Sequence, residues 1–347
     1  MKAGFVGLPG SGKSTLFRAI TRSDGSGDPF RTVSVPDRRV EALSDLFQPK
    51  KKTFAKVECH DMPSIGADEK AEARLFAQMR ELDAIALVAR GFEDSSFAHA
   101  RPSVDVAQDL ERLHAAFQFS DFVQVESRVD KIEKSVNKPS KTQERDKKEL
   151  GVLQKLKVVL EKGGKVEDVS LHASEEELIR GFRFLTQKPV LVVLNLPDDG
   201  KGEAALRASI PATFPRVLPI RGSLEAEIAQ LEAADAAAFM KDYGITEPAR
   251  DRLIAGLYEL LGLCSFLTAG EDECRAWTIR KGTSAAEAGA VIHSDIQRGF
   301  IRAEVVTFDD LMAAGGLKEA KAANRVRLEG KDYVVKDGDV INFRFSV

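Results

Sequence analysis

The chain has 347 residues, with 51 Lys and Arg against 54 Asp and Glu, and its formal net charge of −3 excludes a protein that is basic throughout while leaving room for a local basic patch. Hydrophobic residues make up 43% of the sequence, which is enough for ordinary cores and excludes a disordered chain. No stretch approaches the roughly 18 apolar residues of a membrane span, and the three cysteines lack metal-binding spacing, so we expect a cytoplasmic protein with free thiols and no membrane partner.

The first predicted elements surround a phosphate-binding motif. Residues 2–6 are typical of a short buried strand, residues 7–15 (GLPGSGKST) match the pattern G-x-x-x-x-G-K-[ST] in full, and the apolar spacing of residues 16–20 predicts a helix. Glycines let successive backbone N–H groups turn toward a phosphate, and the positive end of the following helix adds to that field. The order strand, loop, helix disfavours the alternative of a glycine-rich turn without a ligand.

Two side chains of this loop have a direct chemical purpose. We expect the ammonium of Lys13 to reach the β- and γ-phosphate oxygens and the hydroxyl of Ser14 to bind Mg²⁺, which makes these two the predicted catalytic residues. The nucleotide-binding residues predicted in the loop are Gly10, Ser11, Gly12, Lys13, Ser14 and Thr15. The motif does not name the reaction, because small nucleotide kinases and transport ATPases carry it too.

Four further strands are predicted in the first two thirds of the chain. They comprise residues 53–60, 83–90, 188–195 and 216–220, with helical patterns between them. This alternation predicts a doubly wound α/β fold whose ligands bind at the carboxyl ends of the strands. Asp61 follows the first of these strands, where a carboxylate would hold Mg²⁺ through water, although a lone Asp is also typical of a solvated strand cap.

A second candidate nucleotide contact follows the strand 188–195. Asn195 and Asp198 have the spacing of the Asn-Lys-x-Asp motif with which P-loop GTPases read guanine, the Asp accepting from the ring N1–H and the exocyclic amine. Leu196 stands where that motif has the lysine that lies along the base. We predict that Asn195 and Asp198 bind nucleotide, with a plain Asx turn after a strand as the open alternative.

A long insertion precedes the strand 188–195. Apolar residues recur every three or four positions from 104 to 132 and again from 150 to 160, on either side of a polar tip at 137–140, which predicts an antiparallel, coiled-coil-like helical hairpin. Residues 128–165 contain twelve Lys and Arg against six Asp and Glu. This excess indicates either a solvated helical face or a contact with RNA or the ribosome that holds phosphates by charge.

The C-terminal segment predicts a small mixed α+β domain of the β-grasp kind. Residues 275–279 and 301–308 alternate as strands around a helix at 285–292, and residues 333–335 and 340–345 predict a hairpin about a glycine turn. The segment shows no set of acid, base and nucleophile. Its adjacent polar residues are interpreted as cap and surface residues: His293, Ser294 and Asp295.

These motifs together resemble those of the YchF-type, Obg-like ATPases. The phosphate loop GLPGSGKSTL, the sequence RGFED at 90–94 and the sequence LEAEIAQLE at 224–232 are similar to that family. Residues 267–305 and 327–345 are similar to its C-terminal TGS domain. The resemblance covers nearly the whole chain and is most specific in the last eighty or so residues.

The resemblance implies a division into three domains and a function. The implied domains are a P-loop nucleotide-binding domain at 1–95 and 186–262, an inserted helical arm at 96–185 and a TGS domain at 263–347. The implied activity is slow, Mg²⁺-dependent ATP hydrolysis by a molecular switch that associates with the ribosome. The arm region 128–165 and the TGS domain are the expected contacts with ribosome or rRNA, and we expect a monomer.

Several positions depart from the family pattern or align loosely with it. Gly10 replaces an Asn that helps hold a monovalent ion in K⁺-stimulated relatives, and Ser64 replaces the Gly of Asp-x-x-Gly. Ile65 keeps the family's apolar residue where Ras-like enzymes carry a water-positioning Gln. Thr32 is the best match for the Mg²⁺-binding threonine of the first switch segment, so the implied metal ligands are Ser14, Thr32 and Asp61.

The choice of nucleotide and two other functions stay open at this point. Asp198 is nearer to the guanine-reading arrangement than the family's Glu, whereas Leu196 and the sequence Arg-Gly-Ser at 221–223 argue for ATP, which we predict over GTP. One alternative is a degenerate nucleotide-binding adaptor with little hydrolysis that binds ribosome or RNA through the arm and the TGS domain. The other is a small-molecule kinase, which would need an arginine-rich lid.

Overall fold

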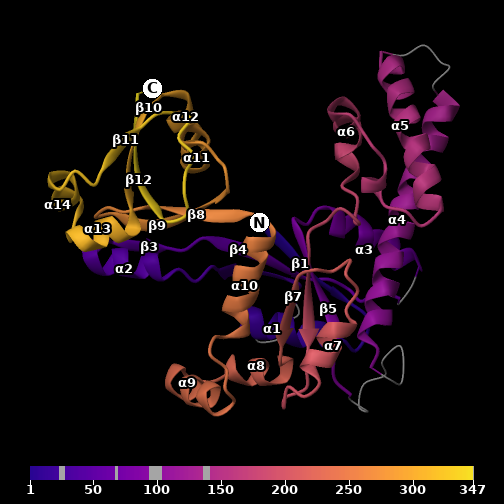
Figure 1. Ribbon diagram of the computed structural model, residues 1–347, viewed down its shortest axis with the longest axis horizontal. Coiled ribbons are helices and arrows are strands. Elements are labelled where there is room, and N and C mark those ends of the chain that lie inside the picture. The colour runs from indigo at the N-terminus through magenta and orange to yellow at the C-terminus, as the bar shows by residue number, and fades with distance from the viewer. Residues whose placement is uncertain (23–27, 67–68, 94–103, 136–140, 347) are drawn as a thin grey trace. The chain divides into compact units, whose positions relative to one another are not determined.

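The computed structural model describes residues 1–22, 28–66, 69–93, 104–135 and 141–346 (Figure 1). The chain divides into two compact units, the first formed by Met1–Arg31 with Glu58–Ala249 and the second by Thr32–Val57 with Arg250–Val347. The chain thus leaves the first unit early, contributes a short segment to the second, and returns. Within the described residues, no helix is long and apolar enough to cross a membrane.

The first unit contains the predicted α/β sheet. Its six strands have the order β2-β4-β1-β5-β6-β7, and β1 pairs in parallel with β4 and β5, β5 with β6, and β6 with β7. This confirms the prediction of a doubly wound α/β fold. The strands of this sheet are β1 (Lys2–Gly7), β2 (Phe30–Ser34), β4 (Lys56–Asp61), β5 (Ala84–Arg90), β6 (Val190–Asn195) and β7 (Val217–Ile220).

Helices accompany these strands along the chain. Every residue of β5 is buried, because a parallel strand in the middle of a sheet is covered on both faces. This burial explains its continuous apolar sequence. The helices of the first unit are α1 (Lys13–Thr21), α3 (Glu69–Arg80), α4 (Val106–Ser135), α5 (Gln143–Glu161), α6 (Ala173–Ile179), α7 (Glu203–Ser209), α8 (Gly222–Ile228) and α9 (Ala233–Asp242), with short 3₁₀ turns η1 (Val166–Asp168) and η2 (Arg180–Phe182).

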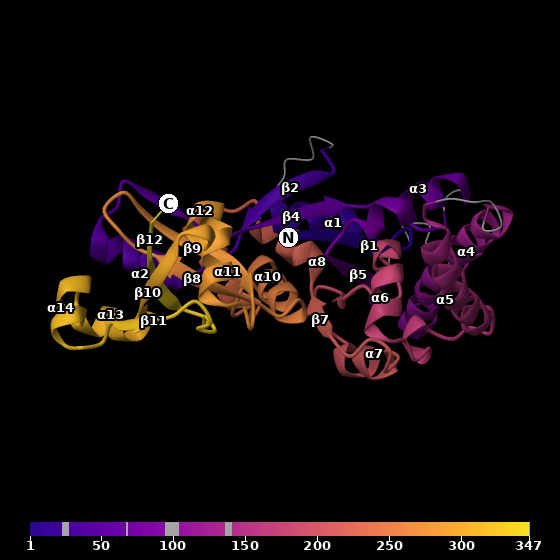
Figure 2. The ribbon, with the colours of Figure 1, turned by 90° about the horizontal axis from the view of Figure 1, so that it is seen from above.

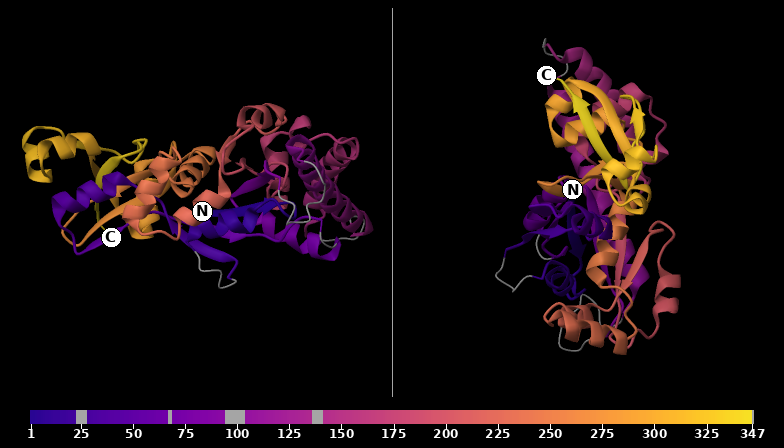
Figure 3. Two further views of the ribbon diagram at one scale, coloured as in Figure 1. Left: turned by 90° about the horizontal axis from the view of Figure 1, so that it is seen from below. Right: turned by 90° about the vertical axis from the view of Figure 1, so that its left-hand side faces the viewer.

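The predicted hairpin of the insertion is confirmed as α4 and α5. The two helices lie side by side in Figure 1 and again in the left view of Figure 3. Val125, Val129 and Leu156 belong to the apolar cluster that joins them, whereas Leu113 and Phe117, nearer the start of α4, pack in the core beneath the sheet. The long helix α4 is therefore shared between the sheet's core and the hairpin, and the predicted polar tip at 137–140 lies outside the described residues.

The second unit has a sheet of its own. Its strands have the order β11-β10-β12-β8-β9-β3, so β3, from the N-terminal part of the chain, forms one edge. Its elements are α2 (Arg38–Phe47), β3 (Lys51–Thr53), α10 (Ala249–Leu260), β8 (Leu263–Thr268), β9 (Glu273–Arg280), α11 (Ala285–Ile292), α12 (Ser294–Arg298), β10 (Phe300–Thr307), α13 (Phe308–Ala314), α14 (Leu317–Ala322), β11 (Arg327–Glu329) and β12 (Asp339–Phe345). The predicted helix at 285–292 is confirmed, and His293 caps α12 by accepting from the Asp295 N–H.

Two predictions of local structure are wrong. The single strand expected at 53–60 is divided, because Lys51–Thr53 pairs with β9 of the second sheet while β4 starts only at Lys56. The expected partner of β12 at 333–335 is not a strand, since β12 pairs with β10 and β8 and Val334 makes only an isolated bridge to Ser284. Both errors arise from pairings with distant strands that the local pattern does not contain.

Candidate functional site

The phosphate loop between β1 and α1 has the conformation that its glycines allow. Gly10 and Gly12 have φ angles of 74° and 82°, in the left-handed region that side chains strain. A Cβ on Gly12 would lie 2.2 Å from Nδ2 of Asn195, so this position also lacks room for any side chain. Gly12 is the N-cap of α1 and offers no side-chain acceptor. The first N–H groups of α1 therefore remain available for an external anion.

Three predicted site residues meet at the start of α1. The Lys13 ammonium lies 2.6 Å from Oδ1 of Asp61 and 3.3 Å from the Ser14 hydroxyl oxygen. The Lys13 side chain is only 8% exposed, and that of Asp61 20%. The ion pair leaves this semi-buried site without a net charge. An unpaired ammonium would lose hydration there, which costs free energy. The structure thus brings the predicted phosphate-binding cation and the predicted metal-binding carboxylate into direct contact.

The oxygen donors at this site fit Mg²⁺. Mg²⁺ prefers oxygen ligands and usually binds through one or two protein groups together with substrate phosphates and water. Ser14 and Asp61 supply a hydroxyl and a carboxylate, both within reach of the Lys13 ammonium. Among the described residues, no group of three or more His, Cys, Asp or Glu could hold a metal on its own. The site therefore suits a metal that arrives with phosphates.

Asn195, at the end of β6, braces the loop. Its side chain is 4% exposed; Nδ2 donates to the Ser11 carbonyl at 3.0 Å, and Oδ1 accepts from the Gly222 N–H at 3.0 Å. Both polar ends of the amide are thus used by backbone groups, one in the phosphate loop and one at the start of α8. The sequence predicts that Asn195 binds nucleotide but does not reveal this structural role.

The other residues of the base-reading motif differ in exposure. Asp198 is exposed three residues beyond the end of β6, where a ligand could reach its carboxylate. Leu196 is 4% exposed and belongs to the apolar core beneath the sheet. A side chain in that position cannot lie along a base as the lysine of P-loop GTPases does. The packing of Leu196 in the core explains why this position is apolar.

A cavity of about 320 Å³ opens over the loop. It is lined by Leu8, Gly10, Ser11, Gly12, Lys13, Ser14, Thr15, Arg18, Ser64, Phe92, Asn195 and Ser223. Phe92 is a residue of the cavity that the sequence motifs do not identify, although it lies within the sequence RGFED at 90–94. Arg90 fixes that segment by donating from Nε to the Phe92 carbonyl at 2.8 Å, and its guanidinium carbon lies 5.2 Å from the ring centre. Phe92 is the aromatic surface that the cavity offers to a base.

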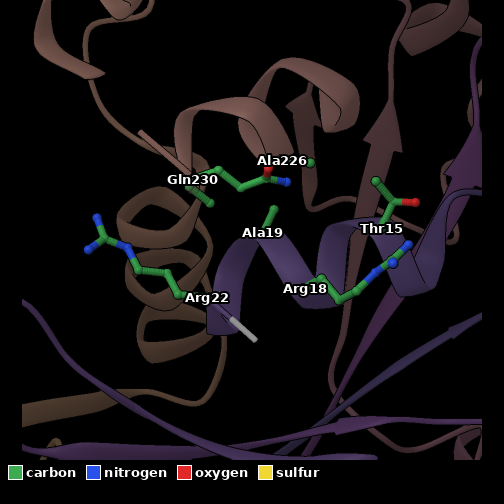
Figure 4. Close-up of a pocket in the computed structure, with 7 residues that line it drawn as sticks. Thr15, Arg18, Ala19, Arg22, Ala226 and Gln230 are labelled. Atoms are coloured by element: carbon green, nitrogen blue, oxygen red, sulfur yellow. The ribbon is translucent and has the colours of Figure 1, made fainter. Parts of the chain in front are cut away.

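A second cavity, of about 490 Å³, continues along α1 (Figure 4). Its lining shares Thr15 and Arg18 with the first, and adds Ala19, Arg22, Ala226, Ala229 and Gln230. In Figure 4 the Arg18 side chain extends toward Thr15, whereas that of Arg22 points the opposite way. The two guanidinium groups therefore do not converge on one point, and Arg18 alone is directed to the phosphate side.

The residues of the segment after β4 differ in their burial. Ser64 lines the cavity, while Ile65 is 4% exposed, packs in the core and donates its N–H to the Gly7 carbonyl at 3.3 Å. Gly66 has a φ of 100°, so the left-handed residue of this loop comes two positions after Ser64. Thr32 is exposed in β2 and belongs to the other compact unit. Its predicted part as a metal ligand stays a prediction.

Family models match both ends of the chain. A model described as "50S ribosome-binding GTPase" matches residues 2–140. The model YchF-GTPase_C, described as "Protein of unknown function (DUF933)", matches residues 263–346. The first match contains the phosphate loop and the second contains most of the C-terminal sheet.

Full-length relatives are also found. The protein named "Ribosome-binding ATPase YchF" in Bacillus subtilis (strain 168) is 39% identical over 368 residues, covering 100% of both chains. The protein of the same name in Haemophilus ducreyi is 37% identical over 364 residues, covering 100% of this chain and 99% of the relative. The "Structure of the Schizosaccharomyces pombe YchF GTPase" superposes with a TM-score of 0.83 at 27% identity, covering 99% of this chain and 97% of that one.

Proposed function

The chain belongs to the YchF family of P-loop NTPases, and from that premise we propose that it is a ribosome-binding ATPase that hydrolyses ATP in the cavity over Lys13. The observation that carries this proposal is the cluster at the start of α1, where the Lys13 ammonium lies 3.3 Å from a hydroxyl and 2.6 Å from a carboxylate, beside helix N–H groups that no side chain caps. A triphosphate with its metal meets each of these groups with complementary charge.

Each residue of the cluster has a proposed part in hydrolysis. Lys13 and the backbone N–H groups from Gly10 to Ser14 stabilise the negative charge that builds up on the phosphate oxygens. Before nucleotide binds, Asp61 holds the Lys13 ammonium; a bound triphosphate attracts that ammonium instead and leaves the carboxylate for the metal. Ser14, Asp61 through water, and Thr32 are the proposed Mg²⁺ ligands. Mg²⁺ neutralises phosphate charge when bound.

We propose a low intrinsic rate. Among the described residues that line the phosphate cavity there is no carboxylate or imidazole that would activate the attacking water. Ile65, at the position of the water-positioning Gln of Ras-like enzymes, lies in the core. A partner that adds or moves a group at the site would raise the rate, as activating proteins do for other P-loop enzymes.

ATP is the proposed nucleotide, with Asp198 as the residue that decides the preference. Leu196 is withdrawn into the core, so the stacking lysine of guanine-specific sites has no counterpart there. The relatives in Bacillus subtilis and Haemophilus ducreyi are named ATPases, whereas the Schizosaccharomyces pombe protein is named a GTPase. The exposed carboxylate of Asp198 is free to accept hydrogen bonds from either base.

The proposed partners and organisation follow from the family. The contacts with ribosome or rRNA lie within the basic arm region 128–165 and the C-terminal domain, without using every basic residue there, and the protein acts as a cytoplasmic monomer. The nucleotide domain (1–95 and 186–262), the arm (96–185) and the TGS domain (263–347) are the proposed functional divisions of the two compact units.

One experiment tests both the activity and the nucleotide. ATP and GTP are titrated with Mg²⁺ into the purified chain, and turnover is measured with and without ribosomes. We expect tighter binding of ATP, slow turnover that ribosomes accelerate, and a loss of about 100-fold or more in turnover for Lys13→Ala. GTP preference that collapses in Asp198→Ala would overturn the choice of nucleotide. Turnover in Lys13→Ala equal to that of the unaltered protein would favour the adaptor function. The burial of Ile65 supports that alternative, because it leaves the site without a water-positioning side chain at this position.

A further inference from the structure

A groove of about 430 Å³ lies on the inserted hairpin. It is lined by Gln124, Ser127, Arg128, Lys131, Arg145, Glu149, Leu178, Gly181 and Phe182, and we call it the arm groove. The first four of these residues come from one face of α4, since their spacing of three and four positions is helical. Arg145 and Glu149 come from α5, and the last turn of α6 with the following 3₁₀ turn η2 forms the third side. Figure 2 shows α6 beside α5.

An ion pair between the two helices forms the floor of the arm groove. Glu149 accepts from Nε and Nη2 of Arg128 at 2.7 Å and 2.8 Å, which is the bidentate arrangement. The Glu149 side chain is 8% exposed, and that of Arg128 is 41% exposed. The bonds to Glu149 raise the pKa of Arg128 above its usual value. The guanidinium is thus held in one orientation while much of it still faces the groove.

Two further cations stand on the rim. Lys131 and Arg145 are exposed, and in the described part of the chain neither has a carboxylate within salt-bridge distance. Two other lysines of the hairpin are paired, Lys155 with Glu175 at 2.9 Å and Lys157 with Glu126 at 3.0 Å. The groove presents two cations on its rim beside the paired guanidinium of Arg128, and its one carboxylate is already used by Arg128.

The groove wall also lacks a hydrogen-bond donor. Nε2 of Gln124 donates to the Phe182 carbonyl at 3.2 Å, which fixes the amide's orientation. Its Oε1 is buried and has no partner among the described residues. A buried acceptor of this kind is normally satisfied by water or by a ligand group.

We infer that the arm groove binds the sugar–phosphate backbone of ribosomal RNA, with Arg128, Lys131 and Arg145 along its successive phosphates. This inference rests on the proposed function, because it assigns the ribosome contact to one face of the hairpin. RNA supplies both things that the groove lacks, namely phosphate anions for the cations and ribose hydroxyls that donate to Gln124 directly or through a bridging water.

The surroundings favour RNA over an acidic protein. Protein interfaces have an apolar centre with a polar rim, but the centre of the arm groove is the Arg128–Glu149 ion pair. The apolar side chains that do line it, Leu178 and Phe182, are half-buried against the hairpin's own apolar cluster, whereas the exposed Phe119, Val123 and Val158 are not among its lining. A charged groove without an exposed apolar centre is the arrangement that grips a phosphate backbone.

The test compares two double variants of the full chain that change the hairpin's charge equally. Lys131→Glu with Arg145→Glu reverses the rim of the groove, whereas Lys147→Glu with Lys162→Glu reverses two exposed lysines of α5 and its C-terminal end that do not line it. Binding to ribosomes is measured by co-sedimentation over a range of salt, and binding to a short RNA hairpin by fluorescence anisotropy, with poly-glutamate as competitor. Melting temperature and ribosome-free ATP turnover report on folding.

We expect the groove variant to bind ribosomes and RNA about tenfold more weakly at 0.1 M salt, and the slope of log K against log salt to flatten by about 1.5, because two phosphate contacts are lost. The control variant should stay within about twofold of the unaltered chain. Equal losses in the two variants, or poly-glutamate competing as well as RNA, would overturn the inference while leaving the ribosome-binding function intact. No ribosome binding by the unaltered chain would instead overturn the function itself.

Discussion

Replacing Asn195 by alanine tests whether this residue holds the nucleotide-free site together. The side chain is 4% exposed and makes two hydrogen bonds of 3.0 Å, to the Ser11 carbonyl and from the Gly222 N–H. Alanine leaves a carbonyl and an N–H without partners in a buried place, and each such group costs about 1–3 kcal/mol. We therefore expect a loss of about 2–6 kcal/mol in the free energy of unfolding without any nucleotide present. For a unit of this size the melting temperature falls by roughly 10 °C.

Scanning calorimetry of the nucleotide-free protein measures this effect, and Asp198→Ala is the matched control. Asp198 belongs to the same motif but is exposed, so its replacement should change stability by no more than about 0.5 kcal/mol while altering nucleotide preference. If Asn195→Ala melted within about 2 °C of the unaltered protein and lost only nucleotide binding, Asn195 would be a base contact, and the bracing role read from its two hydrogen bonds would be refuted.

Three further substitutions follow from the same geometry. Gly12→Ala should abolish binding of a fluorescent ATP analogue, because its φ is 82° and the new Cβ would lie 2.2 Å from Asn195; retained binding would contradict the loop conformation. Arg80→Met should cost about 3–5 kcal/mol in urea unfolding, because it leaves the fully buried Asp121 carboxylate, 2.6 Å from the Arg80 guanidinium, without its cation. Burial lowers the pKa of His114 below its ordinary 6.5, so the unfolded chain binds more protons there and stability falls as pH drops through 6.5; His114→Gln should flatten the dependence of melting temperature on pH.

The phosphate loop could be predicted because its requirements are local. A left-handed backbone at Gly10 and Gly12, an ammonium at Lys13 and a hydroxyl at Ser14 are all specified by consecutive residues. The pairing of Lys13 with Asp61 was also within reach, since the carboxyl ends of adjacent parallel strands meet at one edge of the sheet.

Other features depend on the burial of single side chains. Leu196 and Ile65 have the sequence positions of a base-stacking and a water-positioning residue, yet each is 4% exposed and packs in the core. The sequence reveals that the polar residue is missing at these positions, but only the packing shows that the apolar one contributes to the core instead. Phe92 is the converse case, an aromatic residue that resembles core in sequence and lines the cavity.

Pairings between distant segments were the least predictable. Lys51–Thr53 has the composition of a polar loop, and it becomes a strand because β9 offers its edge in parallel. The turn at Gly338, with a φ of 83°, was located correctly, but the strand after it pairs with β10 and β8 rather than with the residues before the turn. Which strands pair depends on all the strands of a sheet. A local alternation of side chains therefore identifies a strand without identifying its partner.

The burial of Ile65 bears on how the enzyme is controlled. Its N–H donates to the Gly7 carbonyl at the end of β1, so the residue is tied by its backbone to the strand that leads into the phosphate loop and by its side chain to the core. Turning that side chain toward the phosphates would empty a core position, which costs several kcal/mol for a residue of this size. The water-positioning group therefore has to come from elsewhere. A large partner that remodels the neighbouring loop around Ser64, or inserts a group of its own, would account for the proposed acceleration of turnover by the ribosome.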